Sequence, residues 1–363
     1  MRFLFVDLGS GWGGSERYLF WLMSALRARG HWTGCVAPRP EFEPACNRLW
    51  TTGSRFKNLA RARALIEDAV ADECVDLVHY NADRAIHLAP FVRLPARVAT
   101  SATKHLTKPA RKSTLDLRTS IENRLTDLSL RRVGRCICVS PSMLAELTDA
   151  ARARAVLVEN GVPDQRPQQF ARPLTNRVVF LGRVSPEKGI ADLLELAGRS
   201  AARPPAARHW SLCIAGNGPL AGEVERAARE LAPGALSYLG FQSDPGRVYA
   251  DAAALILPSS HEGMPLVVLE AFSWGLPVIA YDIAGVRDIV TDGRNGILVS
   301  PADGVDGLER ALDRLLGDPA SCVRLGMTAR ADYEAGHRVE TMIDKTIALL
   351  EQTASRPAAR QAS

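Results

Sequence analysis

The sequence predicts an α/β protein made of two Rossmann-like domains, each with a parallel sheet. Three observations lead to this fold class. A chain of 363 residues is long for a single hydrophobic core. Short apolar runs alternate with amphipathic segments, which is typical of βαβ units. A polar, proline-containing stretch at 163–173 interrupts that alternation near the middle.

The expected elements follow the chain in order. Strands are expected at 3–7, 33–37, 77–79, 97–101, 136–139 and 156–158, and then at 178–181, 211–215, 237–239, 254–257, 278–280 and 296–299. Helices of the second half are expected at 188–200, 220–231, 245–252, 265–274, 305–316 and 338–351. The predicted boundaries are 1–165 for the first domain, 166–175 for a linker, 176–335 for the second domain, 336–351 for a C-terminal helix and 352–363 for a disordered tail.

Composition narrows the class of protein. Hydrophobic residues make up 47% and charged residues 23%, as in ordinary globular proteins. The apolar run at 3–6 ends at Asp7, and no stretch approaches the ~20 apolar residues that span a bilayer. The seven scattered cysteines include no Cys-x-x-Cys pair, which favours reduced thiols over disulfides or a zinc site. A cytoplasmic protein is therefore expected, with a place at the inner face of the cytoplasmic membrane left open.

The first chemical motif is the glycine-rich stretch 9–16 (GSGWGGSE), between an apolar strand and a helix. Glycines allow close backbone approach, and a helix N-terminus attracts anions. Gly9, Gly11 and Gly14 also fit Gly-x-Gly-x-x-Gly, a dinucleotide signature. That interpretation requires a carboxylate at the end of the second strand, where Pro38 and Arg39 stand instead. A turn without a ligand is the remaining alternative.

The second motif is 182–189 (GRVSPEKG), again between a strand and a helix. Arg183 offers a planar fork of donors and Lys188 a mobile point charge. A cation in the first turn of a helix opposes the helix dipole, so Lys188 favours an anion at this place. A solvated surface loop is the alternative.

The remaining motifs follow later strands. Gly216 begins a turn (GNGP), and Gly240 with Phe241 follows another strand. The stretch 258–271 (PSSHEGMPLVVLEA) places Glu262 before a helix and Glu270 inside it, where an unpaired carboxylate would be costly. Glu270 thus requires a partner, either hydroxyl groups of a ligand or a structural arginine. No Asp-x-Asp pair occurs in the chain, and no metal or cofactor is expected.

Taken together, these motifs resemble the retaining glycosyltransferases of family 4, which have the GT-B fold. The second half matches through GRVSPEKG, AGNGP, the Glu-x7-Glu element EGMPLVVLE and AFSWGLPVIAYDIAG. The first half is similar more loosely, through GWGGSE, DLVHYN, ATKH, VSPSM and ENGVP. The resemblance implies two Rossmann-like domains that face each other across a cleft, with a C-terminal helix that crosses back to the first domain.

The resemblance also implies a role for individual residues. Arg183 and Lys188 would neutralise the donor diphosphate, and Glu270 would bind the ribose. Glu262 would contact the transferred sugar, and His105 would lie near it, with His79 as a competitor for that role. The implied catalytic residues are His105, Arg183, Lys188 and Glu262. The implied donor-binding residues are Gly13, Gly14, Gly182, Arg183, Lys188, Gly216, Gly240, Phe241, Glu262, Gly263, Met264, Pro265, Leu266, Val267 and Glu270.

The acceptor side is indicated by charge. Residues 1–170 hold 25 Lys and Arg against 17 Asp and Glu, whereas the rest holds 20 against 23. The segment 104–135 alone has nine basic and three acidic residues. Leu117, Ile121, Leu125 and Leu128 recur there at helical spacing. The segment is expected either to contact anionic lipid or to pack on the sheet with a solvated basic face. Nucleic acid is not expected, because aromatic residues do not interleave with the basic ones.

The predicted function is a retaining, metal-independent hexosyl- or N-acetylhexosaminyltransferase. The donor would be a nucleoside-diphosphate sugar, with UDP favoured over GDP. The acceptor would be a lipid-linked or polysaccharide glycan, in bacterial surface polysaccharide or glycolipid biosynthesis. Two alternatives stay open: a degenerate subunit that binds a nucleotide sugar without turnover, and an NAD-dependent oxidoreductase.

Overall fold

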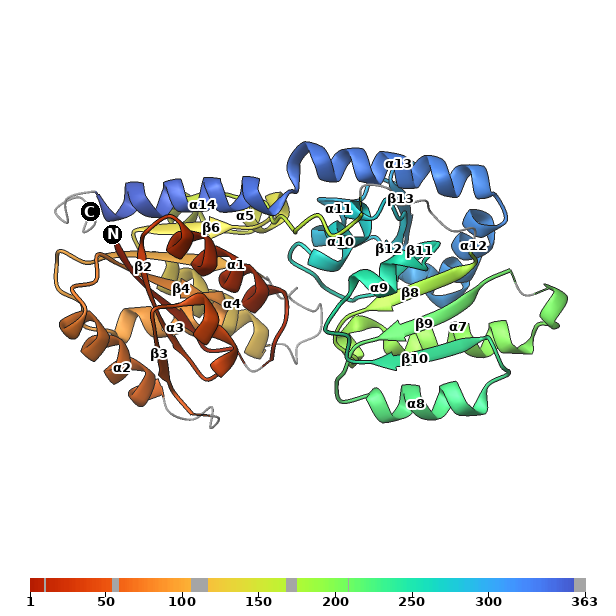
Figure 1. Ribbon diagram of the computed structural model, residues 1–363, viewed down its shortest axis with the longest axis horizontal. Coiled ribbons are helices and arrows are strands. Elements are labelled where there is room, and N and C mark those ends of the chain that lie inside the picture. The colour runs from red at the N-terminus through yellow and green to blue at the C-terminus, as the bar shows by residue number, and fades with distance from the viewer. Residues whose placement is uncertain (10, 54–58, 106–116, 168–174, 208, 356–363) are drawn as a thin grey trace. The chain divides into compact units, whose positions relative to one another are not determined.

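The computed structural model describes the chain except for residues 10, 54–58, 106–116, 168–174, 208 and 356–363. The chain forms two compact units (Figure 1). Unit 1 comprises Met1–Asn160 together with Glu340–Ser363, and unit 2 comprises Gly161–Val339. Within the described residues, no helix is both long enough and apolar enough to cross a membrane.

Unit 1 is built on a parallel sheet of seven described strands in the order β3-β2-β1-β4-β5-β6-β7. The strands are β1 (Arg2–Asp7), β2 (Trp32–Ala37), β3 (Arg48–Thr51), β4 (Leu77–Asn81), β5 (Ala99–Lys104), β6 (Arg135–Cys138) and β7 (Ala155–Leu157). The helices are α1 (Gly14–Ala28), η1 (Pro40–Ala45), α2 (Leu59–Asp72), α3 (Ala82–Leu88), η2 (Ala89–Phe91), α4 (Leu117–Leu130), α5 (Pro141–Ala145) and α6 (Asp149–Arg152). Chain order reverses between β1 and β4, so the segments after these two strands lie at the point where Rossmann-like sheets bind ligands.

The last helix, α14 (Val339–Ala354), returns to unit 1, as the family resemblance implies (Figure 1). The hydroxyl groups of Tyr18 and Thr346 lie 3.4 Å apart. Arg29 forms an ion pair with Asp344. Because α14 extends to Ala354, the first residues predicted for a disordered tail are helical, and residues 356–363 lie outside the described part.

Unit 2 has a parallel sheet of six described strands in the order β10-β9-β8-β11-β12-β13. The strands are β8 (Arg177–Leu181), β9 (Ser211–Ala215), β10 (Leu236–Gly240), β11 (Ala254–Leu257), β12 (Val278–Tyr281) and β13 (Gly296–Val299). The helices are η3 (Pro186–Lys188), α7 (Ile190–Ala202), η4 (Pro205–Ala207), α8 (Ala221–Glu230), α9 (Gly246–Ala250), α10 (Leu266–Ser273), α11 (Ala284–Arg287), η5 (Pro301–Asp303), α12 (Gly304–Leu316) and α13 (Pro319–Gly336). Here chain order reverses between β8 and β11.

The predicted fold class of two parallel Rossmann-like sheets is confirmed. Several elements were not predicted, among them β3 and α13. The edge strand β3 is short and partly exposed, and α13 has two exposed apolar residues, Val323 and Met327. The predicted linker 166–175 lies mostly outside the described residues, and the compact units divide at Gly161.

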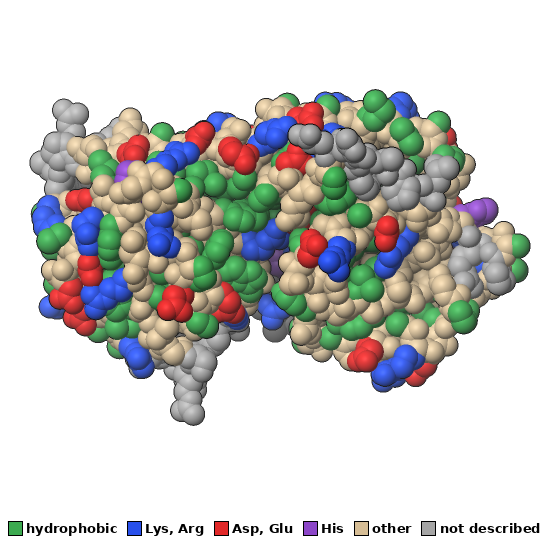
Figure 2. Space-filling model, viewed as in Figure 1, with side chains coloured by type: hydrophobic (Ala, Val, Ile, Leu, Met, Phe, Trp, Pro, Cys, Tyr) green, Lys and Arg blue, Asp and Glu red, His purple; other side chains and the backbone are tan. Residues whose placement is uncertain are grey.

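The surface of the units is mixed in charge. Basic and acidic side chains are interspersed on the face that Figure 2 shows.

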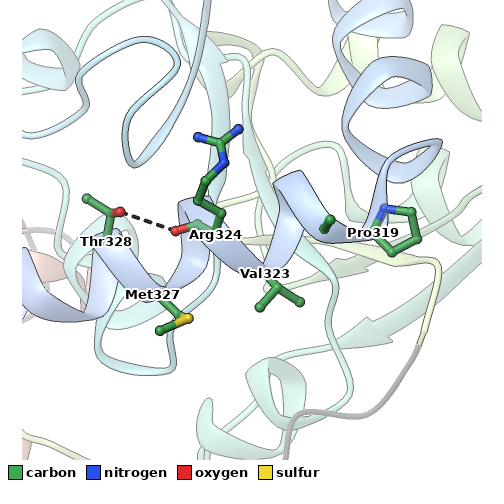
Figure 3. Close-up of a pocket in the computed structure, with 6 residues that line it drawn as sticks. Pro319, Val323, Arg324, Met327 and Thr328 are labelled. Carbon is green, nitrogen blue, oxygen red and sulfur yellow. Dashed lines mark hydrogen bonds between the residues drawn. The ribbon is translucent and has the colours of Figure 1, made fainter.

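A hollow on α13 is lined by Pro319, Ala320, Val323, Arg324, Met327 and Thr328 (Figure 3). None of the residues predicted for the donor site lines this hollow, which lies on the helix rather than at the edge of the sheet.

Candidate functional site

In unit 2, four loops follow the carboxyl ends of neighbouring parallel strands. They begin at Gly182 after β8, at Gly216 after β9, at Phe241 after β10 and at Pro258 after β11. Because these strands are adjacent and parallel, their loops meet at one edge of the sheet. The sheet thus brings together the predicted unit 2 site residues.

Backbone contacts fix these loops against one another. The Gly182 N–H donates to Ala215 O, and the Gly216 N–H donates to Gly240 O at 2.7 Å. Gly216 has a φ of +135°, and a Cβ there would collide with the carbonyl oxygen of Gly182. Glycine at 216 is therefore required by the close approach of two loops.

The loop 182–189 is joined to the loop after β11. The Ser260 N–H donates to Glu187 O at 2.9 Å, and the Ser185 hydroxyl donates to Glu187 Oε1 at 2.6 Å. Gly189 has a φ of +72°, and a Cβ there would collide with the carbonyl oxygen of Pro258. These contacts hold the backbone of the loop without using the cation of Arg183. That side chain is exposed, and it has no ion-pair partner among the residues that the structure describes.

Lys188 contacts Glu262. Its Nζ lies 2.6 Å from Glu262 Oε1, and both side chains are largely buried. This corrects the argument from the helix dipole, which placed Lys188 in the first turn of a helix. Lys188 ends η3, and α7 begins at Ile190 after the left-handed Gly189. The anion that Lys188 requires is supplied at least in part by Glu262.

The helix α10 carries Glu270 and points its N-terminus toward the same edge. Pro265 is the N-cap rather than the first helical residue, and Gly275 follows the helix with a φ of +71°. The first N–H groups of a helix have no intrahelical acceptor, so those of Leu266 and Val267 are suited to an anion. Gly263 and Met264, just before the N-cap, are buried.

Glu270 is 3% exposed, and its Oε2 accepts a hydrogen bond from the Tyr249 hydroxyl at 2.9 Å. Tyr249 lies on α9 and was not predicted. One oxygen of the carboxylate therefore has a neutral partner, the hydroxyl of Tyr249. Phe241, after β10, is 66% exposed, which leaves an aromatic face accessible to a ligand.

In unit 1, the glycine-rich segment is held by two carboxylates of the chain itself. The Gly9 N–H donates to Asp7 Oδ1 at 2.8 Å, and the Gly13 N–H donates to Glu16 Oε2 at 2.9 Å. Gly13 was predicted to bind the donor, and its N–H already has an acceptor in the chain itself. Gly14 begins α1 and remains at the helix N-terminus. Burial and the nearby Glu16 raise the pKa of Asp7 to about 6.

The two candidate histidines lie in different surroundings. His79 is fully buried, and its two ring nitrogens lie 2.8 Å from Ser101 Oγ and 2.9 Å from Thr103 Oγ1. His105 follows β5, is only half-buried, and lies with Nε2 2.8 Å from Asn81 Oδ1. Burial lowers the pKa of each histidine to about 3, and the charge of His105 adds to the effect on His79.

The basic segment differs from the prediction at Lys104. This side chain is 3% exposed, and its Nζ lies 3.5 Å from Asp83 Oδ1, so it does not belong to a basic surface. On α4, Leu125 and Leu128 are 48% and 55% exposed, and so they do not pack on the sheet. Lys108, Arg111 and Lys112 and the side chains of Leu117, Arg118 and Ile121 lie outside the described residues.

Sequence reasoning missed four residues of these networks: Asp7, Glu16, Asn81 and Tyr249. A signal existed for two of them, because Asp7 and Asn81 are polar residues at the end of apolar strands that are neighbours in the sheet. Tyr249 gave no such signal, since it lies on a short helix, and its contact with Glu270 is made with the next helix, α10, after the intervening strand β11.

Comparisons with known proteins identify the family of the chain. The model described as "Glycosyl transferases group 1" matches residues 175–318, and the model "Glycosyltransferase Family 4" matches residues 12–166. The lipopolysaccharide core biosynthesis glycosyltransferase LpsE of Rhizobium meliloti is 27% identical, over 95% of this chain and 97% of its own. The exopolysaccharide phosphotransferase SCO2592 of Streptomyces coelicolor is 33% identical over 49% of this chain, but the match spans only 19% of that protein.

A solved structure gives the same fold. The Anabaena protein HepE in complex with UDP-glucose has a TM-score of 0.80 and 20% identity, with 97% of this chain and 100% of that chain covered. The family models occupy both units, and the motifs predicted for the donor lie within them. The chain belongs to the group 1 glycosyltransferases of family 4, which have the GT-B fold and use nucleotide sugars.

Proposed function

We propose that the protein is a retaining, metal-independent glycosyltransferase. It transfers a hexosyl or N-acetylhexosaminyl group from a nucleoside-diphosphate sugar, UDP rather than GDP, to a lipid-linked or polysaccharide acceptor. The product belongs to bacterial surface polysaccharide or glycolipid biosynthesis. The observation that carries the proposal is the meeting of Arg183, the Lys188–Glu262 pair and the α10 N-terminus at one sheet edge.

The diphosphate is bound by the charges of that edge. Arg183 is exposed and without an ion-pair partner in the described residues, so a bound anion would not have to displace another group. Lys188 is shared between Glu262 and the diphosphate, and the N–H groups of Leu266 and Val267 add donors. Fixed cations at this place stabilise the negative charge that develops on the leaving phosphate, the task that a divalent metal performs in other enzymes.

The nucleoside and the sugar are bound on either side of the diphosphate. Glu270 accepts hydrogen bonds from the ribose hydroxyls, in an orientation fixed by Tyr249. The base lies near Gly240 and the exposed ring of Phe241. Glu262 contacts the transferred sugar, together with Gly263 and Met264.

Unit 1 contributes His105 near the sugar and Gly14 near the diphosphate. The burial of His79 and the use of both its nitrogens favour His105 for this role. In the reaction, the bond between the anomeric carbon and the phosphate oxygen breaks. The acceptor oxygen then bonds to the same face of that carbon, and its proton passes to the departing phosphate.

Incubation with a panel of UDP- and GDP-sugars tests the proposal, with release of the nucleoside diphosphate as the signal. We expect turnover with at least one UDP-sugar, unchanged by a chelator, and an NMR spectrum of the product that shows retention at the anomeric carbon. Donor binding without turnover against every acceptor class would instead favour the degenerate subunit. A rate abolished by the chelator would contradict the metal-independent assignment.

The acceptor proposal rests on α4. Leu125 and Leu128 are exposed on the same side of this helix as Arg124, and Arg131 and Arg132 follow at its C-terminal end with exposed side chains. Such a surface suits the headgroups of anionic lipids, which attract the arginines while the leucines enter the interface. The L125S/L128S double variant should bind vesicles of phosphatidylglycerol more weakly than the wild type does. Equal co-sedimentation of both proteins would remove the proposed contact.

A further inference from the structure

The orientation of the Asn81 amide is determined by its neighbours. Strands β1 and β4 pair Asp7 with Asn81, and Nδ2 of Asn81 lies 2.7 Å from Asp7 Oδ2. The same Nδ2 donates to the backbone carbonyl of Ser15 at 3.2 Å. A carbonyl oxygen can only accept, so the nitrogen of the amide must face Ser15 and Asp7. Oδ1 must then face the opposite way.

This orientation determines which nitrogen of His105 carries the proton. Oδ1 of Asn81 lies 2.8 Å from Nε2 of His105, and an amide oxygen can only accept. Nε2 therefore donates. The ring is neutral at physiological pH, because burial lowers the pKa of His105 to about 3. A neutral imidazole has one N–H, so Nδ1 is left as an acceptor.

Other contacts hold the amide and the ring in place. Asp7 cannot turn away freely, since its Oδ1 accepts from the Gly9 N–H. The residue after Asn81, Ala82, has a φ of +63°, a strained conformation for alanine at the end of β4. The ring of His105 makes an edge contact with Tyr18 at 5.0 Å between centroids. Among the described residues, Nδ1 of His105 has no hydrogen-bond partner.

We propose that Asp7 and Asn81 are positioning residues which hold His105 in the Nε2–H tautomer and so present Nδ1 as a hydrogen-bond acceptor to a hydroxyl of the bound sugar. The proposal rests on the function proposed for His105, but the tautomer itself is a property of the free protein. Specificity follows from it, because a sugar that lacks this hydroxyl leaves the acceptor unpaired.

The experiment is ¹⁵N NMR of the full chain labelled at its histidines, with the His105 signals identified by their loss in His105→Gln. At pH 7.5 we expect the wild type to show a neutral ring with its proton on Nε2. Asn81→Leu removes the acceptor, and the ring should then populate both tautomers. Its kcat/KM for the active sugar nucleotide should fall about 10- to 100-fold, the effect seen when groups that orient metal-bound histidines are removed.

Asn81→Asp is a second variant, in which an oxygen replaces the Nδ2 donor beside Asp7 Oδ2, so the two carboxyl groups must share a proton. It keeps an acceptor for Nε2–H but places a carboxylate beside the ring, so the ring should keep its tautomer and titrate at a higher pH than in the wild type. Ser101→Ala is the matched control, because it removes a hydroxyl from His79 and should shift only the His79 signals.

Two results would overturn the proposal: a wild-type His105 ring with its proton on Nδ1, or an Asn81→Leu ring with an unchanged tautomer. The function proposed for His105 fails separately, if His105→Gln retains full kcat/KM. The wild-type spectrum then still reports whether Asp7 and Asn81 determine the tautomer.

Discussion

The glycine-containing loops of the two units are held in different ways. In unit 2, a Cβ at Gly216 or Gly189 would meet backbone carbonyl oxygens of Gly182 or Pro258. In unit 1, a Cβ at Gly9 would meet the carboxylate of Glu16, which is the end of a side chain. Backbone packing therefore fixes the first set of loops, and side-chain carboxylates fix the second.

This difference determines which charges are left for a ligand. Because the loop 182–189 is held by its backbone, the cation of Arg183 stays exposed. In unit 1, Asp7 and Glu16 accept hydrogen bonds from the loop they support and from Asn81. We infer that the cations of unit 2 act on the ligand directly, whereas the acids of unit 1 act through the groups they orient.

The largest expected effect follows from removing both cations of unit 2. The R183A/K188A double variant should lower kcat at least about 10³-fold, since one donor to a developing anion is worth about 10²–10³-fold. The measurement is steady-state release of the nucleoside diphosphate. Arg229→Ala is the control, because Arg229 is exposed on α8 and pairs only with Glu225 among described acids. Unimpaired catalysis in the double variant would remove the proposed diphosphate site.

Replacing Arg183 and replacing Lys188 should have different effects on the stability of the protein. Arg183→Ala should change the free energy of unfolding by less than about 0.5 kcal/mol, because the side chain is exposed. Lys188→Ala should cost more, since it leaves the largely buried Glu262 without its cation. Equal stability of the two variants would show that the Lys188–Glu262 pair does not hold the loop.

The second prediction concerns the pH dependence of the free energy of unfolding, which we expect to arise from buried groups of unit 1. His79 and His105 have folded pKa values of about 3, below the usual 6.5, so their contribution to stability is present above pH 6.5 and is lost as the pH falls. Between pH 7.5 and pH 5, each histidine should lower the free energy of unfolding by about 2 kcal/mol, since one pKa unit corresponds to about 1.4 kcal/mol.

Asp7 acts in the opposite direction. Its folded pKa of about 6 lies above the usual 3.8, so its contribution is present at low pH and is lost as the pH rises through about 6. It offsets about 1.4 kcal/mol of the loss at pH 5. Urea unfolding should therefore show a net loss of about 3 kcal/mol at pH 5.

The control for this effect replaces single histidines. His79→Gln should reduce the net loss from about 3 to about 1 kcal/mol, whereas His209→Gln, at an exposed position of unit 2, should leave it unchanged. The same free energy of unfolding at pH 5 and pH 7.5 would contradict the assignment of neutral buried histidines.

The third prediction compares the two kinds of loop directly. Gly216→Ala should cost about 2–3 kcal/mol, because the left-handed conformation alone costs roughly 1–2 kcal/mol and the Cβ meets backbone. Gly9→Ala should cost less, about 1–2 kcal/mol, because Glu16 can turn aside and gives up the hydrogen bonds that it accepts from Gly13 and Ser15. If Gly9→Ala were the more costly in chemical denaturation, the contrast between backbone and side-chain support would be wrong.

Much of the fold could be predicted from sequence because the central strands are continuous apolar runs. β8 and β11 were expected at nearly the observed bounds, since strands buried on both faces leave a strong signal. The strand β3 left none, because an exposed edge strand of four residues has neither alternation nor length. The segment of β5 was expected too early, since Thr103 and Lys104 are polar residues that tertiary contacts bury.

The site residues that stand in loop motifs could be predicted from the sequence. The side chains that contact them from distant parts of the sequence could not. Arg183 and Glu262 stand in motifs of fixed spacing, and so their positions could be read from the chain. The contact between Lys188 and Glu262 spans 74 residues, and that between Asp7 and Asn81 also spans 74. Such pairs depend on strand order, which periodicity does not determine.

The smallest effect concerns a glycine that no loop requires. Gly198 lies inside α7, and a Cβ there would meet nothing within 4 Å. Gly198→Ala should therefore stabilise the protein by about 1 kcal/mol, because glycine in a helix interior costs roughly that much relative to alanine. Gly222→Ala, in equally open space in the first turn of α8, should give a smaller gain. Chemical denaturation measures the free energy of unfolding of both variants. If Gly198→Ala lowered it, open space and helical conformation would not suffice to tell a replaceable glycine from a required one. The assignment of Gly216 as a required glycine would then also fail, because it rests on the same two criteria, the space around an added Cβ and the backbone conformation.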